Sequence, residues 1–212
     1  MIIMKKIVPI FLFLLPVTLL AQMNSKEADA LLDKAVAAIK ADAAVQMDYY
    51  YKVLDDDNTI VQQDDGIIRL DGNKYALIMD NMKVWCNGKV QWSYMADIDE
   101  IYITDAASDE AQNLSPLGVM EMYRTGYSSS IKKVGNTTVV TLVSMAADAE
   151  IGKVELCFPD SGYRLGSMTV YMNGQGRVEV QLKNYSAKCK FGKKQYECQL
   201  NEFPSAEVVD MR

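Results

Sequence analysis

The 212-residue sequence contains no histidine. Imidazole is the usual general base beside a nucleophilic serine or cysteine and a frequent zinc ligand, so Ser-His-Asp and Cys-His catalytic systems and histidine metal sites are excluded. A G-x-S-x-G elbow, a P-loop, a G-x-G-x-x-G turn and a C-x-x-C redox motif are also missing. We therefore expect a protein that is not an enzyme and uses no cofactor. A hydrolase based on two carboxylates remains as a catalytic alternative.

Basic residues are too few to balance the acidic ones. The chain has 22 Lys and Arg against 28 Asp and Glu, which gives a net charge of −6. Nucleic acids and anionic membrane surfaces repel an acidic protein. We expect no nucleic acid and no anionic membrane surface among its partners.

A long apolar run occurs only at the start, where residues 1–21 have the features of an export signal. Lys5 and Lys6 precede the apolar run, and the small residue Ala21 is followed by Gln22. The run is short for a membrane span, which favours a cleaved signal over an uncleaved anchor.

Cleavage leaves residues 22–212, enough for one domain with a sizeable core. The net charge becomes −8, because two lysines leave with the signal. No cysteine precedes Cys86, and a lipid anchor requires a cysteine at the cleavage point. We expect a soluble, unanchored, monomeric protein in the periplasm.

The four cysteines leave two readings open. Cys189 and Cys198 flank a short turn and could join a hairpin as a disulfide, which export permits. Cys86 and Cys157 are further candidates, so three pairings are possible. The alternative is that the cysteines are buried free thiols that act as small apolar side chains.

Two helices are predicted. The first covers Asn24–Ala41, with Asn24 as its cap and Glu27 completing a capping box. Ser115-Pro116 is a typical helix start, and Leu117–Thr125 is apolar on nearly every side. Gly126 can end this second helix, and the acidic residues 105–113 before it are expected to form a loop.

The remaining sequence predicts antiparallel strands separated by short turns that contain Asn, Gly or Asp. The expected strands include Val45–Val53, Ile60–Leu70 with an interruption at Gln62–Gly66, Lys74–Asp80, Met82–Cys86, Tyr127–Lys133, Thr137–Met145, Lys153–Phe158, Tyr163–Met172, Arg177–Tyr185 and Gln195–Leu200. Asn87-Gly88 predicts a tight hairpin.

We predict one α+β domain with about ten to eleven strands in a large antiparallel sheet. Such a sheet is long enough to curl, and two helices cannot cover both of its faces. One face must then meet solvent, another sheet or an apolar ligand space.

Polar clusters give little sign of a metal. Five aspartates could offer oxygen ligands to calcium, but their spacing does not match an EF-hand and turns attract aspartate anyway. These residues are Asp55, Asp56, Asp57, Asp64 and Asp65. We expect no metal site.

Methionine is abundant, with 13 residues. Its flexible, polarizable side chain suits surfaces that fit ligands of variable shape, although ordinary core filling explains most methionines. Six of them fall on apolar faces of different expected elements: Met47, Met79, Met120, Met122, Met168 and Met172.

The stretch Val84–Ile103 resembles a sequence block of the periplasmic lipoprotein carriers of the LolA family. The matching residues are Asn87-Gly88-Lys89, Trp92, Tyr94, Glu100-Ile101 and Ile103. Leu114–Leu117 resembles the Ser-Pro helix start of the family, Val178–Tyr185 a late strand, and Glu207–Arg212 its C-terminal tail.

This resemblance implies an incomplete, strongly curved antiparallel barrel with a helical lid over a hydrophobic cavity. It also implies the task of a carrier. Such proteins accept acylated lipoproteins from an inner-membrane ABC-type release complex and pass them to an outer-membrane acceptor. A related lipid is an alternative cargo.

One feature departs from the family pattern. Well-studied members have Arg-Pro before the aromatic residue that Tyr75 matches, and that arginine holds the lid closed. Here Asp71-Gly72 or Gly72-Asn73 stands in its place, and Arg69 comes too early to replace it with certainty. A divergent paralogue is therefore an alternative to the main carrier.

Alternation along strands and family position together give the expected cavity residues. They are Met47, Tyr49, Tyr75, Leu77, Met79, Trp85, Trp92, Leu117, Met120, Met168 and Val170. A sensor or protein-interaction module on the same fold is the main alternative to a carrier.

Overall fold

The computed structural model describes residues 25–159 and 162–212. The predicted export signal, residues 1–21, and the predicted cap Asn24 lie outside these residues. The helices are α1 (Lys26–Ala41), α2 (Asp109–Leu114) and α3 (Pro116–Glu121), with 3-10 turns η1 (Met122–Arg124), η2 (Lys193–Tyr196) and η3 (Leu200–Glu202).

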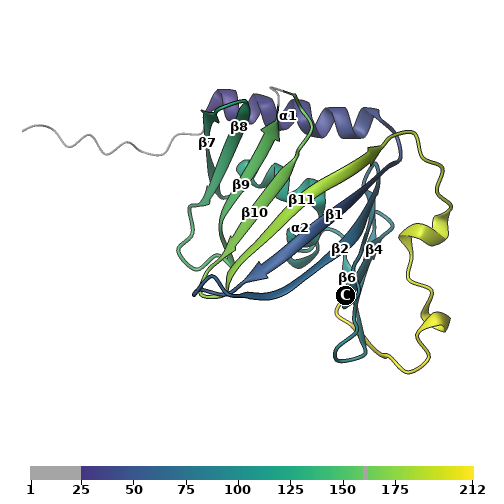
Figure 1. The fold of residues 1–212 in the computed structure, drawn as a ribbon. Coiled ribbons are helices and arrows are strands. Elements are labelled where there is room, and N and C mark those ends of the chain that lie inside the picture. Colours follow the sequence, from purple (N-terminus) through teal and green to yellow (C-terminus); the bar gives the residue numbers. More distant parts are fainter. Residues whose placement is uncertain (1–24, 160–161) are drawn as a thin grey trace, which may run out of the picture.

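The described strands are β1 (Val45–Leu54), β2 (Ile60–Asp71), β3 (Lys74–Ile78), β4 (Met82–Cys86), β5 (Val90–Met95), β6 (Glu100–Asp105), β7 (Tyr127–Val134), β8 (Thr137–Ser144), β9 (Ile151–Pro159), β10 (Ser167–Met172), β11 (Gly176–Ser186) and β12 (Glu207–Asp210). They form one twelve-stranded sheet in the order β12-β6-β5-β4-β3-β2-β1-β11-β10-β9-β8-β7 (Figure 1). The two end strands do not pair with each other, so the barrel is incomplete.

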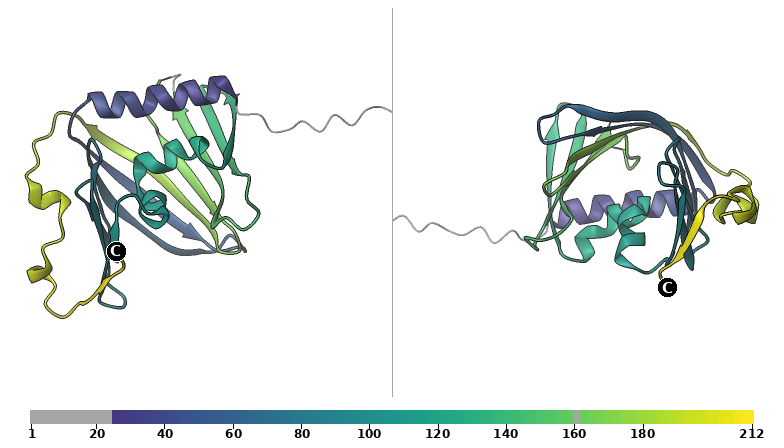
Figure 2. Two further views of the ribbon diagram at one scale, coloured as in Figure 1. Left: turned by 180° about the vertical axis from the view of Figure 1, so that it is seen from behind. Right: turned by 90° about the horizontal axis from the view of Figure 1, so that it is seen from below.

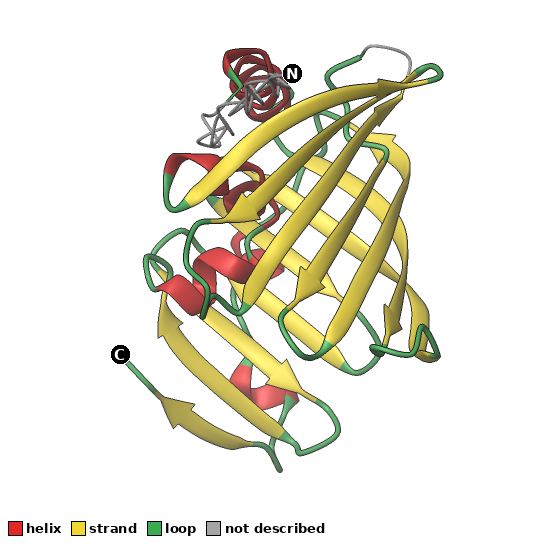
Figure 3. Cartoon of the chain, turned by 90° about the vertical axis from the view of Figure 1, so that its left-hand side faces the viewer, coloured by secondary structure: helices red, strands yellow, loops and turns green. Residues whose placement is uncertain are grey.

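The sheet is strongly curved, and the helices lie across its open side (Figure 2). Figure 3 shows the long strands wrapping around the interior. Buried residues of α1 and α3 pack against the inward-facing residues of β1, β8 and β9 to form the main core. The α+β class, the curvature and the helical cover are confirmed.

Strict alternation explains the inward face of β1. Its residues Met47, Tyr49 and Tyr51 are buried, whereas the side chains between them are partly exposed. The predicted interruption of β2 is wrong, since the strand is continuous through Gly66, which pairs with Tyr49. A side chain at Gly66 would collide with the Tyr49 ring, so glycine is needed there for a close approach.

The first helix begins two residues later than predicted. The Ser25 hydroxyl caps α1 by accepting a hydrogen bond of 3.2 Å from the Ala28 N–H group. The second predicted helix, Leu117–Thr125, is α3 followed by η1, and Gly126 with φ +82° follows its end.

Two further expectations are wrong. The loop expected over residues 105–113 contains most of α2, because the Ser108 hydroxyl caps this helix by accepting a hydrogen bond from the Ala111 N–H group at 3.2 Å. The predicted strand Gln195–Leu200 instead contains the end of η2 and the start of η3. The sheet gains β12, which pairs in parallel with β6.

The turn between β10 and β11 contains two glycines with positive φ, of which only one is in close contact with another strand. Gly176 has φ +80°, and an added Cβ atom would collide with the Leu54 carbonyl oxygen. Gly174 has φ +71° and open space around it. We expect Gly176→Ala to lower the free energy of unfolding by about 2 kcal/mol more than Gly174→Ala, because only Gly176→Ala adds overpacking to the strain of a positive φ.

Urea denaturation of the two variants measures this difference. The two glycines occupy one hairpin and share the sign of φ, so Gly174→Ala controls for strain alone. Equal free energies of unfolding for the two variants would contradict the close approach to Leu54.

Candidate functional site: an apolar cavity in the curved sheet

An open cavity of about 400 Å³ lies between the curved sheet and the α2–α3 segment. Its volume is within the range of about 300–1,000 Å³ that is usual for ligand pockets. The lining residues include Tyr49, Tyr51, Val53, Ile68, Leu77, Met79, Met82, Met95, Leu114, Val119, Ile151, Met168, Val170, Met172, Val178 and Val180.

The lining is almost wholly apolar. Glu150 is its one charged residue, and Gln62 and Asn81 add the amide groups. Five methionines contribute unbranched, flexible side chains to the lining. A long hydrocarbon chain fits such a space because it needs apolar contact without fixed hydrogen bonds.

A second apolar space of about 60 Å³ adjoins the cavity, since Ile68 and Met168 line both. It lies between α1, α3 and the sheet, where Met47, Leu117 and Met120 contribute to its lining. These side chains are almost completely buried and form the inner limit of the accessible space.

The structure brings most of the predicted residues together. Tyr49, Leu77, Met79, Met168 and Val170 line the larger apolar cavity. Met47 of β1 and Leu117 and Met120 of α3 line the smaller apolar space. Tyr75 lines a neighbouring polar cleft. Whether these residues contact a ligand stays a prediction.

Trp85 and Trp92 are placed on the opposite face, so their prediction as cavity residues is wrong. They pack with Ile101 and Ile103 in a separate apolar cluster on the outside of the sheet. Phe203 of the C-terminal segment covers this cluster, with its ring centroid 5.8 Å from that of Trp85. Both faces of β4 carry apolar residues, so alternation alone gave no direction.

The sequence reasoning also missed several lining residues. Tyr51 and Val53 continue the alternation of Met47 and Tyr49, which is the signal that could have identified them. Met172 likewise continues the alternation of Met168 and Val170. Met82 and Val178 carry no comparable signal, because their side of the strand becomes clear only once the sheet curves.

The α2 segment is held by a buried hydrogen bond. The Tyr75 hydroxyl donates to the Ala111 carbonyl oxygen at 3.1 Å and is also bonded to the Gln91 side chain. Burial raises the pKa of Tyr75, with a smaller contribution from Cys86, so the hydroxyl stays protonated and remains a donor.

The residues at the position of the family's Arg-Pro lie at the turn between β2 and β3. Asp71 forms an ion pair with Lys74 at 3.3 Å, and Gly72 has φ +61°. Arg69 donates to the Gln46 side chain at 3.1 Å and stacks on the Phe191 ring. The described contact from this region to α2 is the hydrogen bond between Tyr75 and Ala111.

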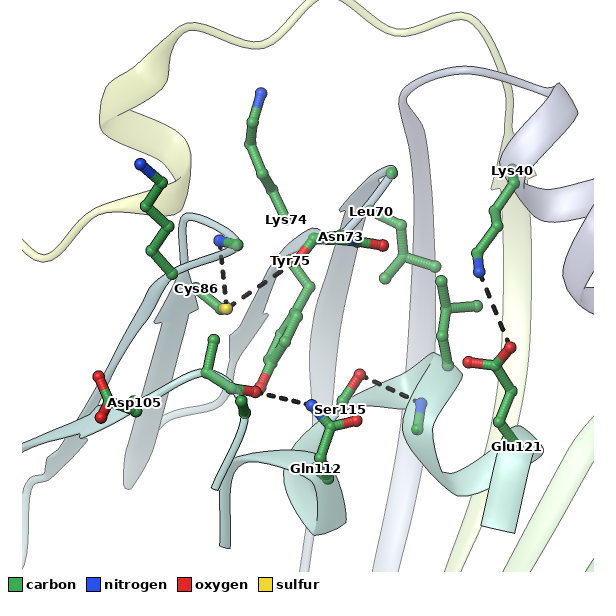
Figure 4. A pocket seen from close by; sticks show the side chains of 17 residues that line it. Lys40, Leu70, Asn73, Lys74, Tyr75, Cys86, Asp105, Gln112, Ser115 and Glu121 are labelled. Carbon is green, nitrogen blue, oxygen red and sulfur yellow. Dashed lines mark hydrogen bonds and ion pairs between the residues drawn. The ribbon is translucent and has the colours of Figure 1, made fainter. Parts of the chain in front are cut away.

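A larger but polar cleft of about 560 Å³ opens on the other side of α2 and α3 (Figure 4). Lys40, Lys74, Lys89, Asp105 and Glu121 contribute charges to its lining. Figure 4 shows Lys40 paired with Glu121, at 3.8 Å between nitrogen and oxygen. Hydrocarbon is poorly accommodated there because these charges would lose water.

Of the two readings left open for the cysteines, the structure has the free thiols, and Cys189 and Cys198 do not form the candidate disulfide. Cys86 and Cys198 are buried. Burial raises the pKa of Cys198 to about 11, with Glu202 adding to the effect, so its thiol is a poor nucleophile at neutral pH.

The acidic turn after β1 binds its own backbone. The Asp55 carboxylate accepts hydrogen bonds from the N–H groups of Asp57 and Thr59, at 3.0 and 2.8 Å. Asp56 accepts one from Gly176 at 3.0 Å. Within the part of the chain that the structure describes, no group of three His, Cys, Asp or Glu residues could hold a metal ion.

Comparison with known families gives one match. The model of the family described as outer membrane lipoprotein carrier protein LolA matches residues 18–176. No curated protein matches the sequence. None of the described helices is long and apolar enough to cross a bilayer.

The solved structures that this chain is similar to are distant in sequence. An uncharacterized conserved protein from Thermus thermophilus has a TM-score of 0.53 at 9% identity, covering 87% of this chain and 99% of that chain. A LolA superfamily protein from Nitrosomonas europaea has a TM-score of 0.45 at 9% identity, covering 82% and 98%. A putative outer membrane lipoprotein-sorting protein domain from Vibrio parahaemolyticus has a TM-score of 0.47 at 8% identity, covering 85% and 99%. The Thermus structure supports the fold alone.

Removing the Tyr75 hydroxyl tests how α2 is held. Tyr75→Phe removes the hydroxyl that bonds to the buried Ala111 carbonyl and the Gln91 side chain, which we expect to cost about 1–3 kcal/mol. Hydrogen exchange in α2 is then expected to speed up. Tyr94→Phe is the control, because the Tyr94 hydroxyl bonds to Asp99, away from α2. Unchanged exchange in Tyr75→Phe would show that α2 is held by other contacts.

The outer aromatic cluster makes a separate spectroscopic prediction. Phe203→Ala uncovers Trp85, so we expect the tryptophan emission maximum to move to longer wavelength. Met168→Ala, on the inner face, is expected to leave it unchanged. If the emission responds to Met168→Ala and not to Phe203→Ala, the tryptophans lie on the inner face of the sheet and the assignment to the outer cluster is contradicted.

Proposed function

The chain belongs to the family of the outer membrane lipoprotein carrier protein LolA, and we propose that it is a periplasmic carrier that shelters the acyl chains of lipoproteins or of a related amphiphile. The observation that carries this proposal is the open apolar cavity of about 400 Å³ on the concave side of the sheet. A folded protein rarely leaves such an apolar space open without a use for it.

The physical need for a carrier follows from hydrophobic hydration. Each CH₂ group of an acyl chain gains about 0.8 kcal/mol when it leaves water, so long chains do not cross an aqueous compartment unprotected. A cavity lined by Val170, Leu77 and several methionines offers that shelter. Methionine adapts to chains of different length and number because its side chain is flexible.

Release requires that the shelter be weak enough to lose its cargo to the next acceptor. The α2–α3 segment forms one wall of the cavity through Leu114, Pro116 and Val119. The helices of this wall are short, and few buried polar bonds tie α2 to the sheet. A short helical cover of this kind can shift at modest cost, which supports exchange of cargo.

The cavity gives little support to a carboxylate-based hydrolase. Glycoside hydrolysis uses two carboxyl groups about 5–9.5 Å apart, and Glu150 is the one carboxylate of the lining. The proposed partners are therefore acylated proteins or lipids, an inner-membrane ABC-type release complex and an outer-membrane acceptor. We propose that the carrier acts as a monomer after removal of residues 1–21.

Native mass spectrometry of the protein from its own periplasm tests the proposal. We expect co-purified species with the masses of acylated proteins or lipids. An empty protein under conditions that keep the fold intact would contradict it.

A matched pair of variants tests whether the cargo binds in the apolar cavity. Val170 faces the cavity, whereas its neighbour Thr169 faces the outside of β10. We expect Val170→Lys to weaken binding of a fluorescent fatty acyl probe about tenfold, because a charge displaces about two CH₂ groups from apolar contact. Thr169→Lys is expected to bind normally. Equal probe affinities for the two variants would move the binding site elsewhere.

A further inference from the structure

The C-terminal part of the chain carries a concentration of positive charge that the carrier function does not use. No Asp or Glu occurs from Val180 to Tyr196, although acidic residues outnumber basic ones in the whole chain. Four lysines fall within residues 188–194, which we call the basic segment. It follows the last residue that the family model matches, residue 176.

The backbone of the basic segment is fixed to the connection between α1 and β1, and its lysines are exposed. The Lys188 N–H group donates to the Asp42 carbonyl oxygen at 3.1 Å, and the Cys189 N–H group to that of Ala44 at 2.8 Å. Tyr196, just after the segment, is 2% exposed and anchors it. All four lysines are exposed.

The basic segment forms one side of a cleft of about 300 Å³. Lys193 lines it from the segment, and Lys74 and Lys89 line it from the facing turns of the sheet. The same two lysines also line the polar cleft of Figure 4, so the two clefts adjoin. Asp71 and Glu197 contribute negative charge to the smaller cleft.

Most of these lysines have no counter-ion. Lys74 is paired with Asp71. Lys89 and the four lysines of the basic segment make no ion pair with any other residue between 25–159 or 162–212. Their charges repel one another and leave a local positive potential on a protein of opposite net charge.

We propose that the basic segment and its cleft bind an extended acidic segment of a partner protein. A peptide chain with repeated carboxylates fits a cleft whose two sides carry lysines, because its carboxylates can form ion pairs with the ammonium groups on both sides. A bilayer is flat and cannot enter the cleft, whereas an extended peptide can lie in it. This interaction is independent of what the apolar cavity carries.

Fluorescence anisotropy with a labelled peptide of alternating glutamate and serine tests the proposal on the purified protein. We expect binding that weakens as salt is added. Reversing two exposed charges, K193E/K194E, is expected to weaken binding about tenfold. Lys89→Glu, on the facing side of the cleft, is expected to weaken it as well.

The control is K132E/K133E on β7, where the two lysines are also adjacent, exposed and without an ion pair among the described residues. It changes the net charge equally and is expected to keep full affinity. Equal losses in the two double variants, or no binding of the peptide, would overturn the proposal. Binding to vesicles with anionic phosphatidylglycerol that is lost in K193E/K194E, while the peptide does not bind, would overturn it in favour of a membrane. Thermal unfolding of each variant verifies that it is folded, and Lys89→Glu provides a second reading if K193E/K194E is not.

Discussion

The pairing of β1 with β11 is the contact on which the rest of the structure depends. It joins two meanders, β2 to β6 on one side and β7 to β10 on the other, into one sheet. Tyr49 lies opposite Leu182 and Tyr51 opposite Val180, so residues more than a hundred positions apart meet in register. A shift by one residue would turn the inward face of β1 to the outside and remove a wall of the cavity.

The cavity exists because the helices do not fill the hollow that this sheet encloses. The main core packs α1 and α3 against β1, β8 and β9. The α2–α3 segment covers the remaining concave surface only in part, so methionine and valine side chains stay accessible there. An apolar surface left open in this way is costly in water, and a hydrocarbon ligand removes that cost.

Charge and apolar surface are separated in space. The apolar cavity has one charged residue in its lining, whereas the polar cleft beyond α2 and α3 is lined by lysines and carboxylates. On the outside, Phe203 and Ala206 cover the tryptophan cluster of β4 and β5, and the basic segment lines the smaller cleft that adjoins the polar cleft. The C-terminal segment thus both covers apolar surface and carries charge.

Local sequence determined most of the strands, their turns and the alternating inward face of β1, because each depends on neighbours along the chain. Met168 and Val170 could be placed toward the interior for the same reason. The direction of Trp85 and Trp92 could not, since both faces of their strands are apolar and a distant segment covers the outer one. The helix α2 was not predicted because its short, acidic sequence forms a helix once Ser108 caps it and Tyr75 holds it. Only the tertiary structure decided the pairing of β1 with β11 and of β12 with β6, the open cavity and the lysine-lined cleft, because each arises from segments that meet only when the sheet curves.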